Sequence, residues 1–365
     1  MVRKSAAVAA IIILAFSVVS IMIPSDTDAA SSYTVKDGTG VEFSFESAPE
    51  HIATVGTGIT ATAIQIGALE KIVVTDKYTK DNSSSVFKDL KDRISDGKVR
   101  ANGSGWTSGQ SDLLADIIYM SEKGVLDKND DLIIITGSYS TLSSFVDNLK
   151  KLGFEKVMVW QDIKDYTEIS AFVESVSKAI NGEVSSYVEQ MDYVAEYIAE
   201  HLEGVEKKKG MFITFSSGDY KVGNKGSLAN SMINAAGGIS ISEDLSKSGS
   251  TYGDKNTMAS LIIANPDAVL FLNSSVADNQ EQVNEISAMG NDGNKLVALD
   301  SLWNNYSIAS MDGVWTMACA LYPDIFEGDV PTVESDEEDN LMLYAGIAVA
   351  AMAIIGIAAF LIIRR

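Results

Sequence analysis

The chain has 365 residues, a formal net charge of −22 and one cysteine, and 46% of its residues are hydrophobic. The excess of acidic side chains argues against binding to nucleic acid or to anionic lipid surfaces. A single cysteine cannot form an internal disulfide, so the fold has to be stabilised by its hydrophobic core. Asn-x-Ser/Thr sequons, which permit glycosylation, begin at Asn82, Asn102, Asn273 and Asn305.

The N-terminus predicts a secretory signal over residues 1–30. Two basic residues precede an apolar run over 6–23, and small residues follow around Ala29 and Ala30. This order of charged, apolar and small residues is typical of a signal peptide cleaved after one of those alanines. An uncleaved signal anchor is the alternative, because the apolar run is barely long enough to span a thinned bilayer.

The C-terminal region predicts a membrane anchor. Residues 341–363 carry no charge, and at about 1.5 Å of rise per residue a helix of this length crosses the hydrocarbon core. Arg364 and Arg365 follow it and favour a cytoplasmic end. A linker over 331–340 precedes it and contains an acidic run over 334–339. We therefore expect an extracellular body tethered to the cell membrane by a single C-terminal transmembrane helix.

Such an anchor suits a cell without an outer membrane, in which a free extracellular protein would be lost. Together with the sequons it suggests an archaeon, and a Gram-positive cell is the alternative.

Between the two ends, strand-like apolar runs alternate with amphipathic stretches. The runs are apolar at almost every position, which is typical of strands in parallel sheets that helices cover on both faces. They are Ile52–Val55, Ile72–Thr75, Leu132–Thr136, Val157–Trp160, Met211–Phe215, Ala268–Leu272 and Leu296–Leu299. A body of about 300 residues exceeds what one core usually serves, so we predict two α/β lobes, over 31–182 and 205–330.

A long helix is expected between the lobes, over 183–204. Gly182 precedes it and Gly204 ends it, as helix boundaries often require. Its apolar residues recur at intervals of three and four and would span roughly 30 Å, which is enough to bridge two lobes. They are Val184, Tyr187, Val188, Met191, Val194, Ala195, Ile198 and Leu202. A rigid bridge of this kind predicts only a small change of lobe angle on binding.

Several segments follow one another in an order that is typical of one protein family. Residues 33–55 would form an opening hairpin and strand, and 56–68 a ligand-side turn and helix. Residues 226–238 would form a helix that ends in paired glycines, and 262–271 an Asn-Pro-Asp turn that leads into a strand. Over about residues 33–327 the chain resembles the class III substrate-binding proteins of ABC importers, which have a rigid interlobe helix and capture iron-siderophores, haem or cobalamin.

The resemblance implies an α/β fold of two Rossmann-like lobes joined by a single long helix. It also implies a binding protein without a cofactor of its own, which takes up a metal-chelate or corrinoid small molecule and delivers it to an ABC permease in the same membrane.

Two positions depart from the family pattern. Members commonly carry an acidic residue after the first turn and another before the paired glycines, where each can contact the permease; here these positions are Ala61 and Asn234. Asp112 and Asp116, on a predicted helix, would be substitutes in the first lobe. The departure leaves a second function open, namely a surface recognition or adhesion protein that has the fold without a permease.

Loops at the carboxyl ends of the strands should converge on a crevice between the lobes. The candidate ligand-binding residues at these ends combine aromatic rings with hydroxyls and amides and carry almost no charge, which suits a large organic ligand. They are Thr57, Gly58, Tyr78, Trp106, Tyr139, Trp160, Tyr220, Asn273, Trp303, Asn304 and Tyr306. Trp303 and Tyr306 are the strongest candidates, because Asn304 and Asn305 lie between them.

Neither a bare-metal site nor an active site is expected. His51 and His201 are the only histidines and lie far apart on framework elements, while Cys319 lies in an apolar helical stretch. Haem held through a tyrosine such as Tyr139 or Tyr220 is an alternative. The sequence has no serine nucleophile elbow, zinc-protease motif or phosphate-binding loop, so we do not predict an enzyme.

Overall fold

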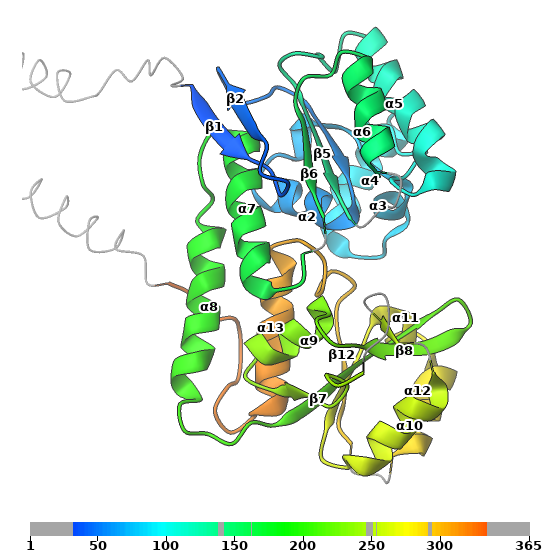
Figure 1. The fold of residues 1–365 in the computed structure, drawn as a ribbon, viewed down its shortest axis with the longest axis vertical. Coiled ribbons are helices and arrows are strands. Elements are labelled where there is room, and N and C mark those ends of the chain that lie inside the picture. The colour runs from blue at the N-terminus through cyan, green and yellow to red at the C-terminus, as the bar shows by residue number, and fades with distance from the viewer. Residues whose placement is uncertain are drawn as a thin grey trace, which may run out of the picture.

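The structure is a computed structural model, and it describes residues 32–137, 142–161, 163–245, 251–252, 254–290 and 294–333. In these residues two α/β lobes are joined along one side by a pair of helices (Figure 1). The predicted signal segment, the predicted transmembrane segment and the acidic run over 334–339 lie outside the described residues. Within the described ranges, no helix combines the length and apolar character that crossing a bilayer requires.

The N-terminal lobe is built on a four-stranded parallel sheet in the order β4-β3-β5-β6. Its strands confirm the predicted runs: β3 is Ile52–Val55, β4 is Ile72–Val74, β5 is Leu132–Thr136 and β6 is Val157–Trp160. β3, β4 and β5 are buried along their whole length, as expected of strands that are covered on both faces. An antiparallel hairpin of β1 (Tyr33–Lys36) and β2 (Glu42–Phe45) precedes the sheet.

Helices cover both faces of this sheet. α5 (Gln110–Glu122) and α6 (Leu142–Lys151) pack on one face, in a hydrophobic cluster that includes Ala53 and Ile135. α2 (Thr57–Gln65) and α7 (Tyr166–Asn181) pack on the other. The shorter helical segments of the lobe are η1 (Leu69–Lys71), α3 (Lys77–Asp81), η2 (Ser85–Phe87), α4 (Lys88–Ser95) and η3 (Thr107–Gly109).

The C-terminal lobe has a six-stranded mixed sheet in the order β10-β8-β7-β11-β12, with β9 paired to the start of β7. Four of its strands are parallel, β9 among them, and the other three correspond to predicted runs: β7 (Lys209–Ser216), β11 (Val269–Leu272) and β12 (Leu296–Ala298). The other strands are β8 (Asp219–Gly223), β9 (Ile239–Ser240) and β10 (Thr251–Tyr252), and the helices are α9 (Leu228–Ala235), α10 (Lys255–Ala264), α11 (Ser274–Ala277), α12 (Gln280–Met289) and α13 (Ala309–Leu321).

The antiparallel partner of β7 was not predicted from the sequence. β7 and β8 form a hairpin in which Ser216 pairs with Asp219, so only Ser217 and Gly218 form its loop. Both loop residues have positive φ, 55° and 81°, as a type I′ turn requires. The end of β7 is therefore not an open loop like the ends of the parallel strands.

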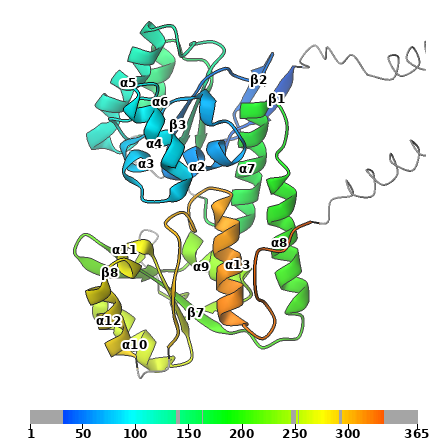
Figure 2. The same ribbon diagram turned by 180° about the vertical axis from the view of Figure 1, so that it is seen from behind.

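Two helices connect the lobes where the sequence predicted one. α7 and α8 (Tyr187–His201) lie side by side, and α8 carries the chain from the N-terminal to the C-terminal lobe (Figures 1 and 2). α8 is shorter than the predicted helix over 183–204, because Ser185 is bound through its N–H to the Ser177 hydroxyl before the helix begins. Val184, a member of the predicted apolar face, is accordingly 46% exposed.

One hydrophobic cluster extends through both lobes and the connecting helices. It contains Ile134 of β5, Phe172 of α7, Val194 of α8, Phe212 of β7 and Val314 of α13. Figure 2 shows α13 beside α8, where the C-terminal lobe packs onto the connection. Because these elements share one core, a rotation of one lobe against the other would have to separate packed apolar side chains.

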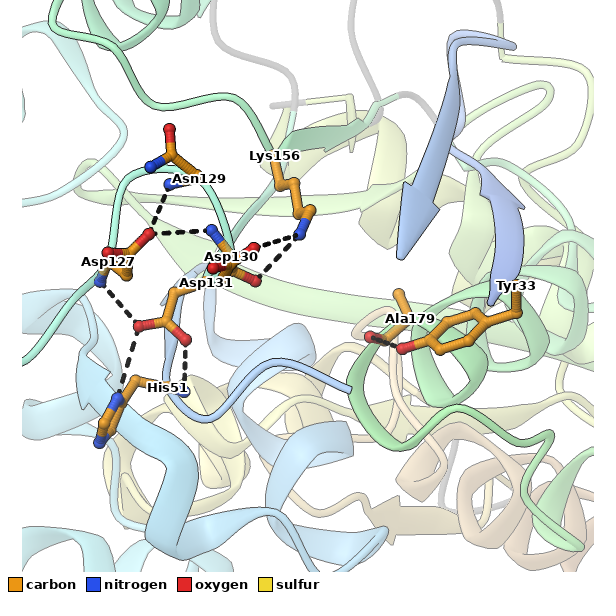
Figure 3. A network of polar contacts seen from close by, with 8 residues as sticks. All are labelled: Tyr33, His51, Asp127, Asn129, Asp130, Asp131, Lys156 and Ala179. Atoms are coloured by element: carbon orange, nitrogen blue, oxygen red, sulfur yellow. Dashed lines mark hydrogen bonds and ion pairs between the residues drawn. The ribbon is translucent and has the colours of Figure 1, made fainter. Parts of the chain in front are cut away.

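A polar network lies where strands β3 and β5 of the N-terminal sheet begin (Figure 3). The buried Asp131 carboxylate accepts hydrogen bonds from the backbone N–H groups of His51 and Asp127, both at 2.8 Å, and lies 3.4 Å from the His51 ring. Asp127 in turn accepts from the N–H groups of Asn129 and Asp130, which hold the pKa of its carboxyl below the usual range. His51 thus has the framework position that the sequence predicts.

Phe172 offers a direct test of the shared core. Its ring is fully buried and lies 5.3 Å from the ring centroid of Trp160 in β6 and 6.4 Å from that of Tyr306 in the other lobe. We expect Phe172→Ala to lower the free energy of unfolding by about 3–5 kcal/mol, and Phe172→Leu, which leaves a smaller cavity, by roughly 1–2 kcal/mol. Urea unfolding should show a single transition for both variants, and a separate transition for each lobe would contradict the shared core.

Candidate ligand-binding site

A cavity of about 400 Å³ lies between the lobes, where strand ends of the N-terminal sheet face the loop before α13. Its walls come from the start of α2, the ends of β4 and β5, the segment around Trp106 and the loop over 304–306. The residues that line it are Gly56, Thr57, Gly58, Asp76, Tyr78, Trp106, Thr136, Gly137, Asn304, Asn305 and Tyr306. The cavity therefore lies in the crevice that the strand order predicts.

The structure brings together six of the predicted ligand-binding residues, namely Thr57, Gly58, Tyr78, Trp106, Asn304 and Tyr306. Trp106 and Tyr78 are 51% and 46% exposed, which is unusual for large aromatic side chains. Two exposed rings in the wall of one cavity form a surface on which a flat or bulky ligand can stack.

At Gly58 the backbones of the two lobes approach each other closely. A Cβ atom at this position would lie 2.7 Å from the carbonyl oxygen and 2.8 Å from the backbone nitrogen of Tyr306, so only glycine fits. Gly56 is constrained as well, because its φ is 122° and a Cβ would lie 2.1 Å from the Thr136 hydroxyl oxygen. The first turn of α2 thus sits directly against the backbone of the C-terminal lobe.

Asp76 is the cavity residue that sequence reasoning missed. Its carboxylate is 2% exposed and accepts hydrogen bonds from the N–H of Gly56 on one oxygen and from the N–H of Thr79, at 2.8 Å, on the other. Burial raises the pKa of this carboxyl against the lowering effect of those bonds. The residue directly follows the predicted strand over 72–75, so the strand-end rule could have found it, and the same holds for Thr136 at the end of β5.

Two polar side chains of the cavity are available to a ligand. Among the described residues, the Thr57 hydroxyl and the Asn304 amide have no hydrogen-bond partner, and both residues are half-buried. By contrast, the Asn305 amide donates to the carbonyl of Ser301 at 3.0 Å and holds its own loop. Stacking surfaces beside unused hydroxyl and amide groups are the features of a site for an organic molecule with a polar edge.

Two predicted tryptophans are placed elsewhere. Trp303, a favoured candidate, is 1% exposed and packs on Phe212 at 4.9 Å between ring centroids. The loop after β12 turns it under α13, where the backbone at Gly313 passes within contact distance. Trp160 packs against Phe172 and Gly38 and does not line the cavity. Trp303 therefore does not line the 400 Å³ cavity; its buried side chain contributes to a smaller cavity of about 240 Å³ between η2 and the start of α13.

Tyr220 is also misplaced, because it lies on the unpredicted strand β8. It is buried against Phe215, and its hydroxyl donates to the Glu285 carboxylate at 2.6 Å. Burial and Glu285 raise the pKa of this phenol well above its usual range, which opposes the phenolate that would bind haem iron. Asn273 caps α11 by accepting from the N–H of Ser275 and does not line the cavity. Tyr139 lies outside the described residues.

The structure also places the candidate permease contacts. Ala61 is fully buried within α2, so position 61 is not at the surface. Asp116 is buried and bound to Arg100 and Asn102, so its predicted role as a docking carboxylate is wrong. Asp112, in the first turn of α5, is exposed. Asn234 is exposed on α9, where it lines a separate groove of about 540 Å³ between α8 and α9.

Nothing in the described residues forms a metal-binding group of three or more His, Cys, Asp or Glu side chains. His201, at the end of α8, stacks on Tyr197 at 4.0 Å between ring centroids, and its Nδ1 bonds the Tyr197 carbonyl. Cys319 is half-buried in α13, and burial raises the pKa of its thiol. These side chains serve the framework of the protein.

Neither a protein-family model nor a curated protein matches the sequence, but solved structures match the fold. Helicobacter pylori CeuE with Ni(II) bound superposes with a TM-score of 0.58 at 18% identity, over 81% of this chain and 91% of that one. A periplasmic heme-binding protein from Pseudomonas aeruginosa has a TM-score of 0.55 at 14% identity, with coverage of 78% and 96%. The chain has the fold of the class III periplasmic binding proteins.

A third protein of this fold is the periplasmic vitamin B12-binding protein BtuF of Vibrio cholerae. Its TM-score is 0.53 at 16% identity, over 75% of this chain and 98% of that one. Most of each of these chains is matched, so the likeness extends over both lobes and their connection.

The contact at Gly58 predicts that a glycine-to-alanine substitution lowers the free energy of unfolding, which is the opposite of its usual effect in a helix. Replacing a helical glycine by alanine ordinarily stabilises a protein by about 0.5–1 kcal/mol. Here we expect Gly58→Ala to destabilise it by about 1–3 kcal/mol, because the new methyl group meets the Tyr306 backbone and has to push the lobes apart. Urea unfolding measures the change, and a stabilised variant would show that the lobes do not touch at this point.

Proposed function

We propose that this chain is an extracellular, membrane-tethered substrate-binding protein that captures a metal chelate for an ABC importer. The ligand class comprises ferric siderophores, haem and cobalamins. One observation carries the proposal: in a fold shared with heme- and vitamin B12-binding proteins, an interlobe cavity is lined by exposed aromatic rings and unused polar groups.

The cavity has suitable size and chemistry for part of such a ligand. Small-molecule sites are commonly about 300–1,000 Å³, and this one is about 400 Å³. Each ring that stacks on a conjugated ligand would contribute about 0.5–1.5 kcal/mol beyond the area it buries. Thr57 and Asn304 would orient the polar edge of the ligand. A chelate larger than the cavity would bind with one face inside and the other in solvent.

The tether is part of the proposal and follows from the predicted signal and transmembrane segments. The last described residues lie along α8, where the Gln190 side chain bonds the carbonyl of Pro331 and the N–H of Val333. The chain would then leave the body beside the connecting helices rather than from either lobe. This exit would keep both lobes free to meet a permease.

The second candidate function, recognition or adhesion without a permease, depends on the docking positions. The exposed Asn234 still favours it, since no charge is present there to pair with a basic permease residue. Ala61 does not favour it, because this position is buried and not at the surface. Permease and ATPase genes next to the gene for this protein would support import, and surface-layer or adhesin genes would support the alternative.

Tryptophan fluorescence tests the proposal, because Trp106 is the tryptophan that lines the cavity. Titration of the detergent-solubilised full chain with ferric siderophores, haemin and cobalamins should give saturable quenching by at least one of them. Trp106→Phe should lose most of the quenching and weaken binding only severalfold, because phenylalanine keeps part of the stacking surface.

The matched control is Trp315→Phe. Trp315 is buried beside Phe326, and its indole N–H donates to the carbonyl of Gly328, far from the cavity wall. This variant should keep both the affinity and the quenching that Trp106 supplies. Saturable binding of none of the chelates would contradict the proposed function.

A further inference from the structure

The cavity has an unusual charge balance. Of its described lining residues, Asp76 is acidic and none is Lys, Arg or His. The remaining side chains are aromatic rings, hydroxyls and amides, all of which are neutral near pH 7. In the described part of the wall, a ligand in this cavity therefore meets one carboxylate and no compensating cation.

The Asp76 carboxylate lacks a charged partner within the described part of the chain. No ion pair there includes it, and its hydrogen bonds come from the N–H of Gly56 and from backbone and side-chain groups of the α3 turn, none of which carries a charge. The neighbouring Lys77 has its Nζ 5.2 Å from the centre of the Tyr78 ring and is not part of the cavity wall. N–H donors on both of its oxygens stabilise the ionised form against the effect of burial, and an ionised carboxylate out of bulk water creates a negative potential that water screens weakly.

The net charge of the whole protein also favours cationic ligands over anionic ones. With a net charge of −22, its long-range field raises the local concentration of cations and lowers that of anions. Recognition of a ferric tris-catecholate or of the haem propionates usually calls for Arg or Lys side chains, which pair with anionic oxygens. This cavity offers amides and hydroxyls instead, which bind neutral carbonyl and amide edges well.

We infer that the interlobe cavity selects chelates that are neutral or positively charged and rejects polyanionic ones. The inference rests on the proposed function and narrows it, since it favours hydroxamate-type ferric chelates and cobalamins over tris-catecholates and haem. Selectivity arises because an anion loses its hydration on entering the site and gains no cationic partner, whereas a cation gains the field of Asp76.

Pairs of ligands of equal shape and different charge test this directly on the detergent-solubilised full chain. Ferrioxamine B carries a free ammonium group, which its N-acetyl derivative lacks; aquacobalamin is a cation, and cyanocobalamin is neutral. The cationic member of at least one pair should bind severalfold more tightly, and this advantage should shrink as salt is added. Ferric enterobactin, a trianion, and haemin should bind at least a hundredfold more weakly than the best cation.

Asn304 provides the matched variants, because its side chain has no partner among the described residues that a substitution would break. Asn304→Lys places a cation in the wall and should weaken binding of the cationic chelate at least tenfold more than binding of its neutral counterpart. Asn304→Gln keeps the side chain neutral but displaces the amide, so it should change both affinities by the same factor.

The outcomes separate the two claims. Binding of ferric enterobactin or haemin as tightly as of the best cation would overturn the inference and leave the proposed function intact. An Asn304→Lys variant that affects cationic and neutral chelates equally would also overturn it. If none of these ligands shows saturable binding, the proposed function and this inference both fail.

Discussion

The hydrophobic core that runs from the N-terminal sheet through α7 and α8 to α13 holds the rest of the structure in place. Phe172 lies at the centre of this core, between Trp160 of one lobe and Tyr306 of the other. A close-packed contact of this kind has few alternative arrangements. The distance between the lobes should therefore stay constant as long as the core is intact.

The cavity depends on this fixed distance. Because Gly58 lies against the Tyr306 backbone, the first turn of α2 and the loop over 304–306 form adjoining walls. The same turn is bound through Gly56 to Asp76, so the charge in the cavity is held by the element that contacts the second lobe. A ligand that enters such a site has little ordering cost to offset, which favours binding through shape and charge complementarity.

The strands and the two-lobe fold could be predicted from sequence, because buried parallel strands such as Ile52–Val55 and Leu132–Thr136 are apolar at almost every position. The candidate site was predictable only in part. The strand-end rule found Thr57, Tyr78 and Asn304. It cannot tell whether a loop aromatic turns outward or inward, and so it grouped them with Trp303, whose ring is buried on Phe212 and does not line the same cavity. The prediction for Tyr220 was wrong because its segment is not a loop. A two-residue turn makes it an antiparallel strand, and the alternation of apolar runs and amphipathic stretches did not reveal this.

The rigidity of the lobes is the central claim, and a distance between them tests it most directly. Spin labels at Tyr119→Cys on α5 and Ile263→Cys on α10, both exposed positions, in a Cys319→Ser background would report that distance by pulsed electron spin resonance. We predict one narrow distribution whose centre is unchanged when the chelate that binds most tightly is added. A second population, or a shift larger than the width of the ligand-free distribution, would show that the shared core does not fix the lobes.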